Sequence, residues 1–165
     1  MTSRRRVLVL LFLLAGCGSD QLTAPEPEPR LVLGTGELEF APIDGEPRAS
    51  LVAGAQGGFH VWAAFLVYGF DSTDLELLLA TSVEGDPDSR VVLRGHLMLH
   101  ETLDATGEPA LSFAGFPAQV YDARCAQGKR VRLDASVSDP RGAVAQDTRY
   151  VIADIEAMRR SDNCR

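Results

Sequence analysis

Ten consecutive residues, Phe59 to Tyr68, constrain the fold of this chain more than any other segment. The run FHVWAAFLVY is rich in aromatic and β-branched residues and contains no glycine, proline or acidic residue. Polar residues do not alternate with apolar ones along this run. A strand that is covered by protein on both faces has the same continuous apolar pattern. The sequence therefore predicts a central β-strand that is buried on both faces.

Other strand-like segments follow along the chain, separated by turn residues. Lys129–Val137 alternates most cleanly: apolar Val131, Leu133, Ala135 and Val137 would point to one face and polar residues to the other. The remaining expected strands cover residues 37–40, 49–53, 75–83, 91–100, 113–121 and 148–155. Turns are expected at residues 84–88, 107–109 and 138–142.

Three of these segments leave alternatives open. The leucine run within 75–83 would also suit a buried helical turn. Pro117 suits an edge strand or a β-bulge. Residues 152–160 are the one segment with a helix-like period.

Seven to nine short strands with regular turns predict an all-β fold, an antiparallel β-sandwich. The hairpin formed by 130–137 and 148–155 is similar to the closing strands of immunoglobulin-like domains. The cysteines do not have the immunoglobulin spacing, so the expected likeness is one of architecture. A single sandwich domain is expected over residues 31–165.

The first sixteen residues have the three parts of a secretory signal peptide. Arg4, Arg5 and Arg6 precede an apolar run from Val7 to Leu14, and the small residues Ala15 and Gly16 follow. The run is far too short to cross a bilayer, which takes about 20 apolar residues. Cleavage by the general signal peptidase and a buried strand are the alternatives from these residues alone.

Leu14-Ala15-Gly16-Cys17 resembles the lipobox of bacterial lipoprotein precursors. The resemblance implies that residues 1–16 are removed and that Cys17 carries a diacylglyceryl group, with a fatty acid such as palmitate on its amino group. It also implies a membrane partner, reached through this lipid, and a place in the cell envelope. Gly18 follows the cysteine instead of an inner-membrane retention signal, which by analogy favours the outer membrane.

Residues 17–30 are expected to form the lipidated N-terminus and a tether. Pro25, Pro27 and Pro29 alternate with other residues, a pattern that favours an extended polyproline II chain. Removal of the three signal arginines leaves 13 basic against 23 acidic residues, a net charge of −10. Such a surface repels nucleic acid, which we therefore exclude as a partner.

Two cysteines remain besides Cys17. Cys125 and Cys164 are an even pair in a compartment where disulfides persist, and a disulfide between them is expected. Two free thiols are the alternative, and the spacing matches no zinc motif.

Gly54–Trp62 has the form GxQGGxHxW. Together with Cys125, Gly128 and the turn at 139–142, it resembles uncharacterised lipoproteins of the myxobacterial type, a group to which no activity is attached. Gly57 and Gly58 would allow positive φ before the strand, with Trp62 filling the core. Alternatively, Gln56, the glycines, His60 and Trp62 belong to a ligand loop at one end of the sandwich.

Histidine and methionine suggest a second function. Strand alternation would place His96, Met98 and His100 on one face, and imidazole with thioether suits copper. However, His96 and His100 would lie about 13 Å apart along a strand, so His60 would have to join one end.

No sequence motif of a hydrolase, metalloprotease or nucleotide-binding enzyme is present, and neither a catalytic residue nor a cofactor is expected. The sequence therefore predicts a non-catalytic envelope protein that binds a protein or a glycan, or has a structural role. A periplasmic copper carrier using His60, His96, Met98 and His100 is the alternative.

Overall fold

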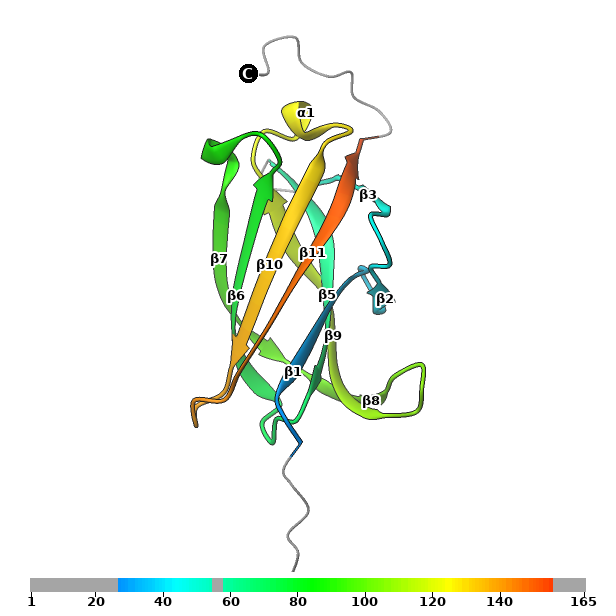
Figure 1. The fold of residues 1–165 in the computed structure, drawn as a ribbon, viewed down its shortest axis with the longest axis vertical. Coiled ribbons are helices and arrows are strands. Elements are labelled where there is room, and N and C mark those ends of the chain that lie inside the picture. Colours follow the sequence, from blue (N-terminus) through cyan, green and yellow to red (C-terminus); the bar gives the residue numbers. More distant parts are fainter. Residues whose placement is uncertain (1–26, 55–57, 156–165) are drawn as a thin grey trace, which may run out of the picture.

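The computed structural model describes residues 27–54 and 58–155, and this part of the chain forms two β-sheets packed face to face (Figure 1). The two helical segments described are short: the 3-10 turn η1 (Pro87–Ser89) and the helix α1 (Ala123–Ala126). The strands in chain order are β1 (Arg30–Thr35), β2 (Ala41–Pro42), β3 (Arg48–Ser50), β4 (Val52–Ala53), β5 (Phe59–Tyr68), β6 (Asp74–Val83), β7 (Val91–Met98), β8 (His100–Leu103), β9 (Pro109–Val120), β10 (Arg130–Ser138) and β11 (Val144–Asp154).

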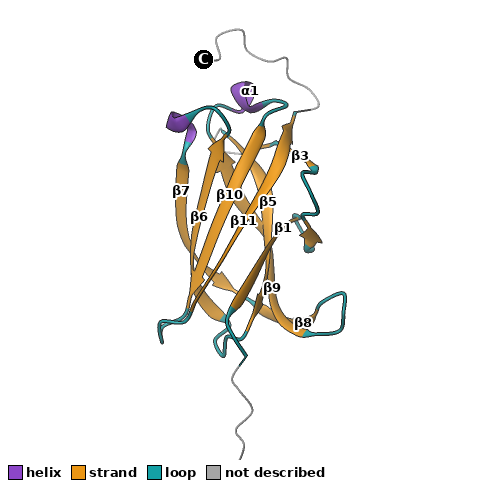
Figure 2. Ribbon diagram, in the orientation of Figure 1, coloured by secondary structure: helices purple, strands orange, loops and turns teal. Residues whose placement is uncertain are grey.

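These strands, orange in Figure 2, belong to two sheets. The first, sheet A, has the order β2-β1-β5-β9-β8, and β4 adds to one end of β5. The second, sheet B, has the order β3-β11-β10-β6-β7. Neighbouring strands are antiparallel except β3 and β11, which run parallel. The predicted all-β sandwich is confirmed, whereas its immunoglobulin-like character stays a prediction at this level.

The core lies between the sheets and follows the alternation of the strands. On β10 the buried residues are Val131, Leu133, Ala135 and Val137, as the sequence predicts. On β5 the inward side chains are Val61, Ala63, Phe65 and Val67. Burial of these side chains is the main stabilising contribution, at about 25 cal/mol per Å² of apolar surface.

Strand β5 is central, as predicted, with β1 on one side and β9 on the other. Its second face is also covered, because Leu66 and Tyr68 pack there in a smaller cluster with Ala110, Val32 and Phe40. Residues 75–83 likewise lie in a strand, β6, and form no helical turn.

The first predicted strand is wrong. Residues 37–39 form a bend and Phe40 belongs to no strand. The strand lies earlier, at β1, which begins at the last residue of the predicted tether, Arg30. Leu31 and Leu33 supply its inward face, and Gly36, at a φ of 136°, ends the extended stretch. The alternation of polar and apolar residues at 37–40 predicts that Leu38 is buried, but its side chain is 88% exposed.

Two further predicted strands are each divided between the sheets. Within 49–53, the chain leaves sheet B after β3 and joins sheet A as β4, with buried Leu51 at the crossing. Within 91–100, β7 ends in sheet B and β8 begins in sheet A, with buried Leu99 between them. Alternation alone does not reveal such a crossing, because the chain stays extended through it.

Strand β9 lies between β5 and β8, but β8 pairs only with its first four residues, Pro109–Ser112. The later part, which contains Pro117, pairs with β5 alone among the described strands, so Pro117 lies on an edge segment as expected. The predicted bulge is confirmed: the pairing of β5 with β9 shifts register between Ala63 and Phe65. Gly115 lies in the bulge with a φ of 84°, and its N–H donates to the carbonyl of Gly36 over 2.9 Å. The bulge thus holds the chain after β1 against sheet A.

The sandwich has two poles. The chain enters β1 at one pole, and β11 ends at the opposite pole beside α1 (Figure 1). The predicted signal peptide, Cys17 and most of the predicted tether lie outside the described residues, as do the last ten residues. Within 152–160, residues 152–154 belong to β11 and not to a helix.

The described part of the chain contains no helix of the length and hydropathy needed to span a membrane.

Candidate binding site

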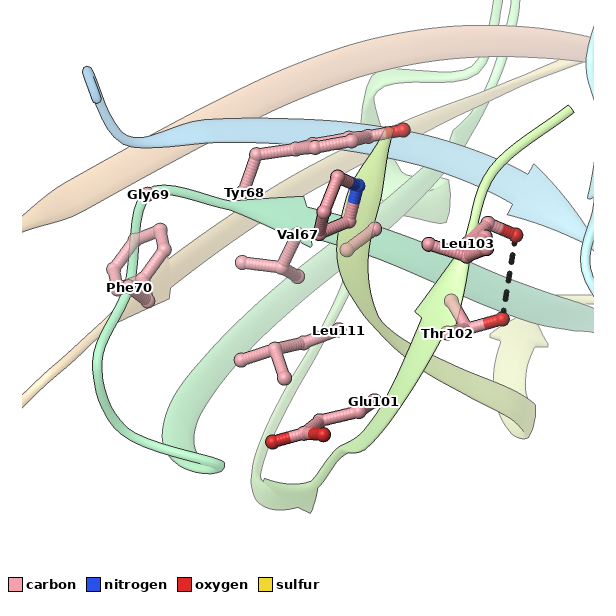
Figure 3. A pocket seen from close by; sticks show the side chains of 10 residues that line it. Val67, Tyr68, Gly69, Phe70, Glu101, Thr102, Leu103 and Leu111 are labelled. Atoms are coloured by element: carbon pink, nitrogen blue, oxygen red, sulfur yellow. Dashed lines mark hydrogen bonds between the residues drawn. The ribbon is translucent and has the colours of Figure 1, made fainter. Parts of the chain in front are cut away.

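A hollow of about 510 Å³ lies where β5 ends, between β8 and the start of β9. Val67, Leu111 and Glu101 form one row across these strands, because they pair in register. Figure 3 shows their side chains, with that of Phe70, extending to one side of the strands, while Tyr68 extends to the other. The hollow therefore combines core-type apolar walls with one exposed carboxylate.

A second hollow, of about 420 Å³, lies on the outer face of sheet A. Its apolar walls come from Leu38 and Phe40 after β1, and from Leu66 on β5. His100 and Ser112 contribute polar groups, and the His100 Nε2 atom lies 2.8 Å from the Ser112 Oγ atom. Apolar walls with a few converging polar groups are typical of binding sites for small ligands and peptides.

The two hollows meet at β8, since Thr102 and Leu103 line both of them. Leu103 is 66% exposed and Leu38, at the second hollow, is 88% exposed. Both leucines line the second hollow and so extend its apolar walls to the surface.

The turn from β8 to β9 is fixed by Asp104. Its Oδ1 atom accepts bonds from the Thr106 hydroxyl, the Thr106 N–H and the Glu108 N–H, at 2.7 to 3.0 Å. Its Oδ2 atom accepts a bond from the Tyr68 hydroxyl at 2.9 Å. These bonds, the one from the Thr106 side chain above all, lower the pKa of Asp104 to about 2. Asp104 is therefore ionised at neutral pH and holds the turn against β5.

Tyr68 connects this turn to the first strand. The Arg30 guanidinium stacks 3.5 Å from the centre of the Tyr68 ring and forms an ion pair of 2.8 Å with Glu108. Burial, followed by the hydrogen bond to Asp104, raises the pKa of Tyr68. The phenol accordingly stays protonated and donates to Asp104, so this wall of the site is preorganised.

The structure separates the residues of the predicted copper site. His96 and Met98 lie on the exposed face of β7 in sheet B, whereas His100 lies on β8 in sheet A. The expectation that all three share one face is wrong, because the chain changes sheets at Leu99. The His96 Nδ1 atom instead lies 3.5 Å from an Asp74 carboxylate oxygen. Over residues 27–54 and 58–155, no three His, Cys, Asp or Glu side chains are grouped to hold a metal ion.

His60 and Trp62 lie side by side on the outer face of sheet A. Their ring centres are 4.2 Å apart in an edge-to-face arrangement, and Trp62 is half-buried there instead of filling the core. His60 is only 8% exposed, and its Nε2 atom has no hydrogen-bond partner among the described residues. Burial lowers the pKa of His60, and the charge of Glu37 opposes this shift. Neither residue lines the hollows beside β8.

Several predicted site residues lie outside the described part of the chain: Cys17, Gln56, Gly57 and Cys164. Gly58 has a φ of 84°, as its predicted role before the strand requires. Cys125 lies in α1, at the pole opposite the start of β1. The Cys125–Cys164 disulfide stays a prediction.

Sequence reasoning missed the two hollows. Their walls come from residues that look like ordinary strand or turn residues, among them Leu66, Leu103 and Leu111. The one available signal was the polar turn 104–108, whose Asp-x-Thr-Gly pattern suits an Asx turn at the end of a hairpin. That signal locates the turn but does not show which strands lie beside it.

No protein-family model, no curated protein sequence and no solved structure matches this chain.

Proposed function

We propose that this chain is a lipid-anchored protein of the bacterial cell envelope whose β-sandwich has a non-catalytic role in binding. The observation that carries the proposal is the Leu14–Cys17 lipobox directly after a complete signal peptide. Two or more acyl chains on one cysteine are enough for stable anchoring, since each buried CH₂ contributes about 0.8 kcal/mol.

The arrangement of the domain supports this anchoring. The chain enters the sandwich at one pole, through Pro27 to Pro29, and the described chain ends at the other. An extended tether spans about 3.1 Å per residue, so residues 18–29 would reach roughly 40 Å. A domain attached in this way can meet partners beyond the headgroups with its sides and its far pole.

The candidate site favours binding over catalysis. Ser112 on β9 and His100 on β8 lie directly opposite each other in the sheet. The hydrogen bond between their side chains is an ordinary cross-strand contact that stabilises the pairing of the two strands. Nucleophilic catalysis would also need a group that orients the base. Among the described residues, Ser112 is the one side chain hydrogen-bonded to His100.

We further propose an immunoglobulin-like topology for the sandwich. Sheet A contains the order β1-β5-β9-β8 and sheet B the order β11-β10-β6-β7. These orders correspond to strands ABED and GFCC′ of that architecture. In this correspondence β10 and β11 are the closing F and G strands. An architecture of this kind is used by many proteins for recognition, so it supports a binding role by analogy only.

The lipid anchor can be tested in a bacterial host that processes lipoproteins. Wild-type protein should incorporate radiolabelled palmitate and sediment with membranes, whereas Cys17→Ala should do neither. Ser19→Ala, two residues further on, is the matched control and should behave as wild type. Wild-type protein that stays unlabelled and soluble after export would contradict the proposed anchor.

A further inference from the structure

We propose that β8 is a docking edge for an extended segment of a partner protein in which apolar and basic residues alternate. This inference rests on the proposed binding role and names the class of partner. It does not depend on the lipid anchor.

The first argument is the place of β8 in the fold. β8 is the last strand of sheet A, and among the described strands β9 is its one neighbour. An edge strand presents unpaired N–H and C=O groups, to which an extended peptide can add as a further strand. His100, Glu101 and Leu103 are exposed, so β8 lies at the surface of the described chain.

The second argument is the position of the two hollows. Side chains of an added strand alternate between the two faces of the sheet. The hollow around Phe40 and Leu66 lies on the outer face, and the hollow around Val67 and Leu111 draws on the inner face. Since both hollows are also lined by β8, successive side chains of an added strand would enter them in turn.

The third argument is the chemistry of each hollow. The outer hollow has leucine, phenylalanine and proline walls, which suit a leucine or valine side chain. The inner hollow has apolar walls that include Val67, Phe70 and Leu111, and Glu101 is the one charged side chain among its lining residues (Figure 3). A lysine or arginine can bury its aliphatic stem on such walls while its charged end meets the carboxylate.

The fourth argument is charge. Glu39, Glu101 and Asp104 line the hollows, and there is neither lysine nor arginine among the described residues that line them. This complementarity favours a basic partner and disfavours anionic lipid headgroups. The edge of sheet B, β7, exposes Arg94 and His96 beside Asp74 and Glu76 of β6, so its charge is mixed.

The test uses full-length protein with its lipid anchor in detergent and a fluorescently labelled, end-capped peptide that alternates lysine with leucine or valine. We expect saturable binding by fluorescence anisotropy, weakened by salt. Glu101→Lys should weaken the affinity roughly tenfold or more, because it places like charges together. A peptide with glutamate in place of lysine should bind Glu101→Lys better than it binds the wild type.

Glu76→Lys is the matched control, since Glu76 is an exposed carboxylate on β6 in the other sheet and its reversal changes the net charge equally. This variant should bind the lysine peptide as the wild type does. Amide hydrogen exchange locates the peptide: protection should appear in residues 100–103 and not in 91–98. Both variants are exposed substitutions, and unchanged thermal unfolding confirms that they fold.

Equal weakening by Glu101→Lys and Glu76→Lys would overturn the proposal, because binding would then follow overall charge. Protection of β7, or saturable binding of phosphatidylethanolamine vesicles that excludes the peptide, would also overturn it. The Cys17→Ala protein should bind the peptide unchanged. Failure of the anchor and failure of the docking edge are therefore separate results.

Discussion

At the scale of the residue, single side chains hold loops against the sheets. Asp104 does this through four hydrogen bonds. Asp139 does it at the β10–β11 hairpin of sheet B by accepting bonds from the N–H groups of Arg141 and Ala143. Both carboxylates act as hydrogen-bond acceptors, so each holds its turn best in the ionised form. The Asx-type turns that they close were partly predictable, whereas the contact of Asp104 with Tyr68 joins residues 36 positions apart and was not.

Asp104→Asn tests the first of these turns through pH. The folded pKa of Asp104, about 2, lies below its usual value of 3.8, so its contribution is present above pH 4 and is lost as the pH falls towards 2. We expect the thermal midpoint of the variant to be lower than that of the wild type at pH 7, and the difference to shrink towards pH 2. Asp44→Asn, in the exposed loop after β2, is the control for the loss of one charge, and at pH 7 it should lower the thermal midpoint less than Asp104→Asn does. A constant difference across this range would contradict the assignment.

Gly115→Ala tests the close contact at the bulge. A β-carbon on Gly115 would lie 2.5 Å from the carbonyl oxygen of Glu37, and the φ of 84° adds strain. Gly45, at a φ of 70°, has nothing within 4 Å, so Gly45→Ala carries the conformational cost alone, about 1–2 kcal/mol. Urea unfolding should show a clearly larger loss of stability for Gly115→Ala. Equal losses would mean that the chain after β1 is not held at the bulge.

At the scale of the element, period-two alternation decides which strands could be predicted. β5, β6 and β10 lie where the sequence places them, because each keeps to one sheet for its full length. β1 was missed because it is short and next to a proline-rich stretch. The ends of β3 and β7 were missed because the crossings at Leu51 and Leu99 depend on which sheet the next residues join, a tertiary property.

Leu133→Ala tests whether β10 anchors the core. Leu133 is fully buried between the sheets, and removal of such a side chain costs about 2–5 kcal/mol. Leu78, opposite Ser136 on the outer face of β6, is 36% exposed, and Leu78→Ala should cost under about 1 kcal/mol. Chemical denaturation of both variants gives the two free energies. Similar losses would contradict the assignment of inner and outer faces.

At the scale of the whole molecule, the two poles differ in what they carry. One pole receives the chain from the N-terminus, and the hollows beside β8 lie towards it. The other carries α1 with Cys125. Neither the poles nor the hollows could be predicted, because both depend on how strands distant in the sequence pair.

The predicted disulfide is tested at this scale. A bond between Cys125 and Cys164 would close a loop of about 40 residues and add about 4 kcal/mol in the chain-entropy model. Cys164→Ser should therefore lower the free energy of unfolding, whereas Ser161→Ala in the same tail should not. Mass spectrometry after alkylation provides the direct check: without reductant, neither thiol should react. Alkylation of both would show that the bond does not form.

The path by which the chain enters the fold has a mechanical consequence. β1 follows directly from Pro27–Pro29 and pairs antiparallel with β5 over six residues, while its Leu33 N–H donates to Asp147 of the other sheet. A pull on a membrane-anchored tether would act along β1 and load these hydrogen bonds together in shear, not one after another. Resistance to such a pull is governed by the unfolding rate. The strand that sequence reasoning assigned partly to the tether would thus bear the load between membrane and domain.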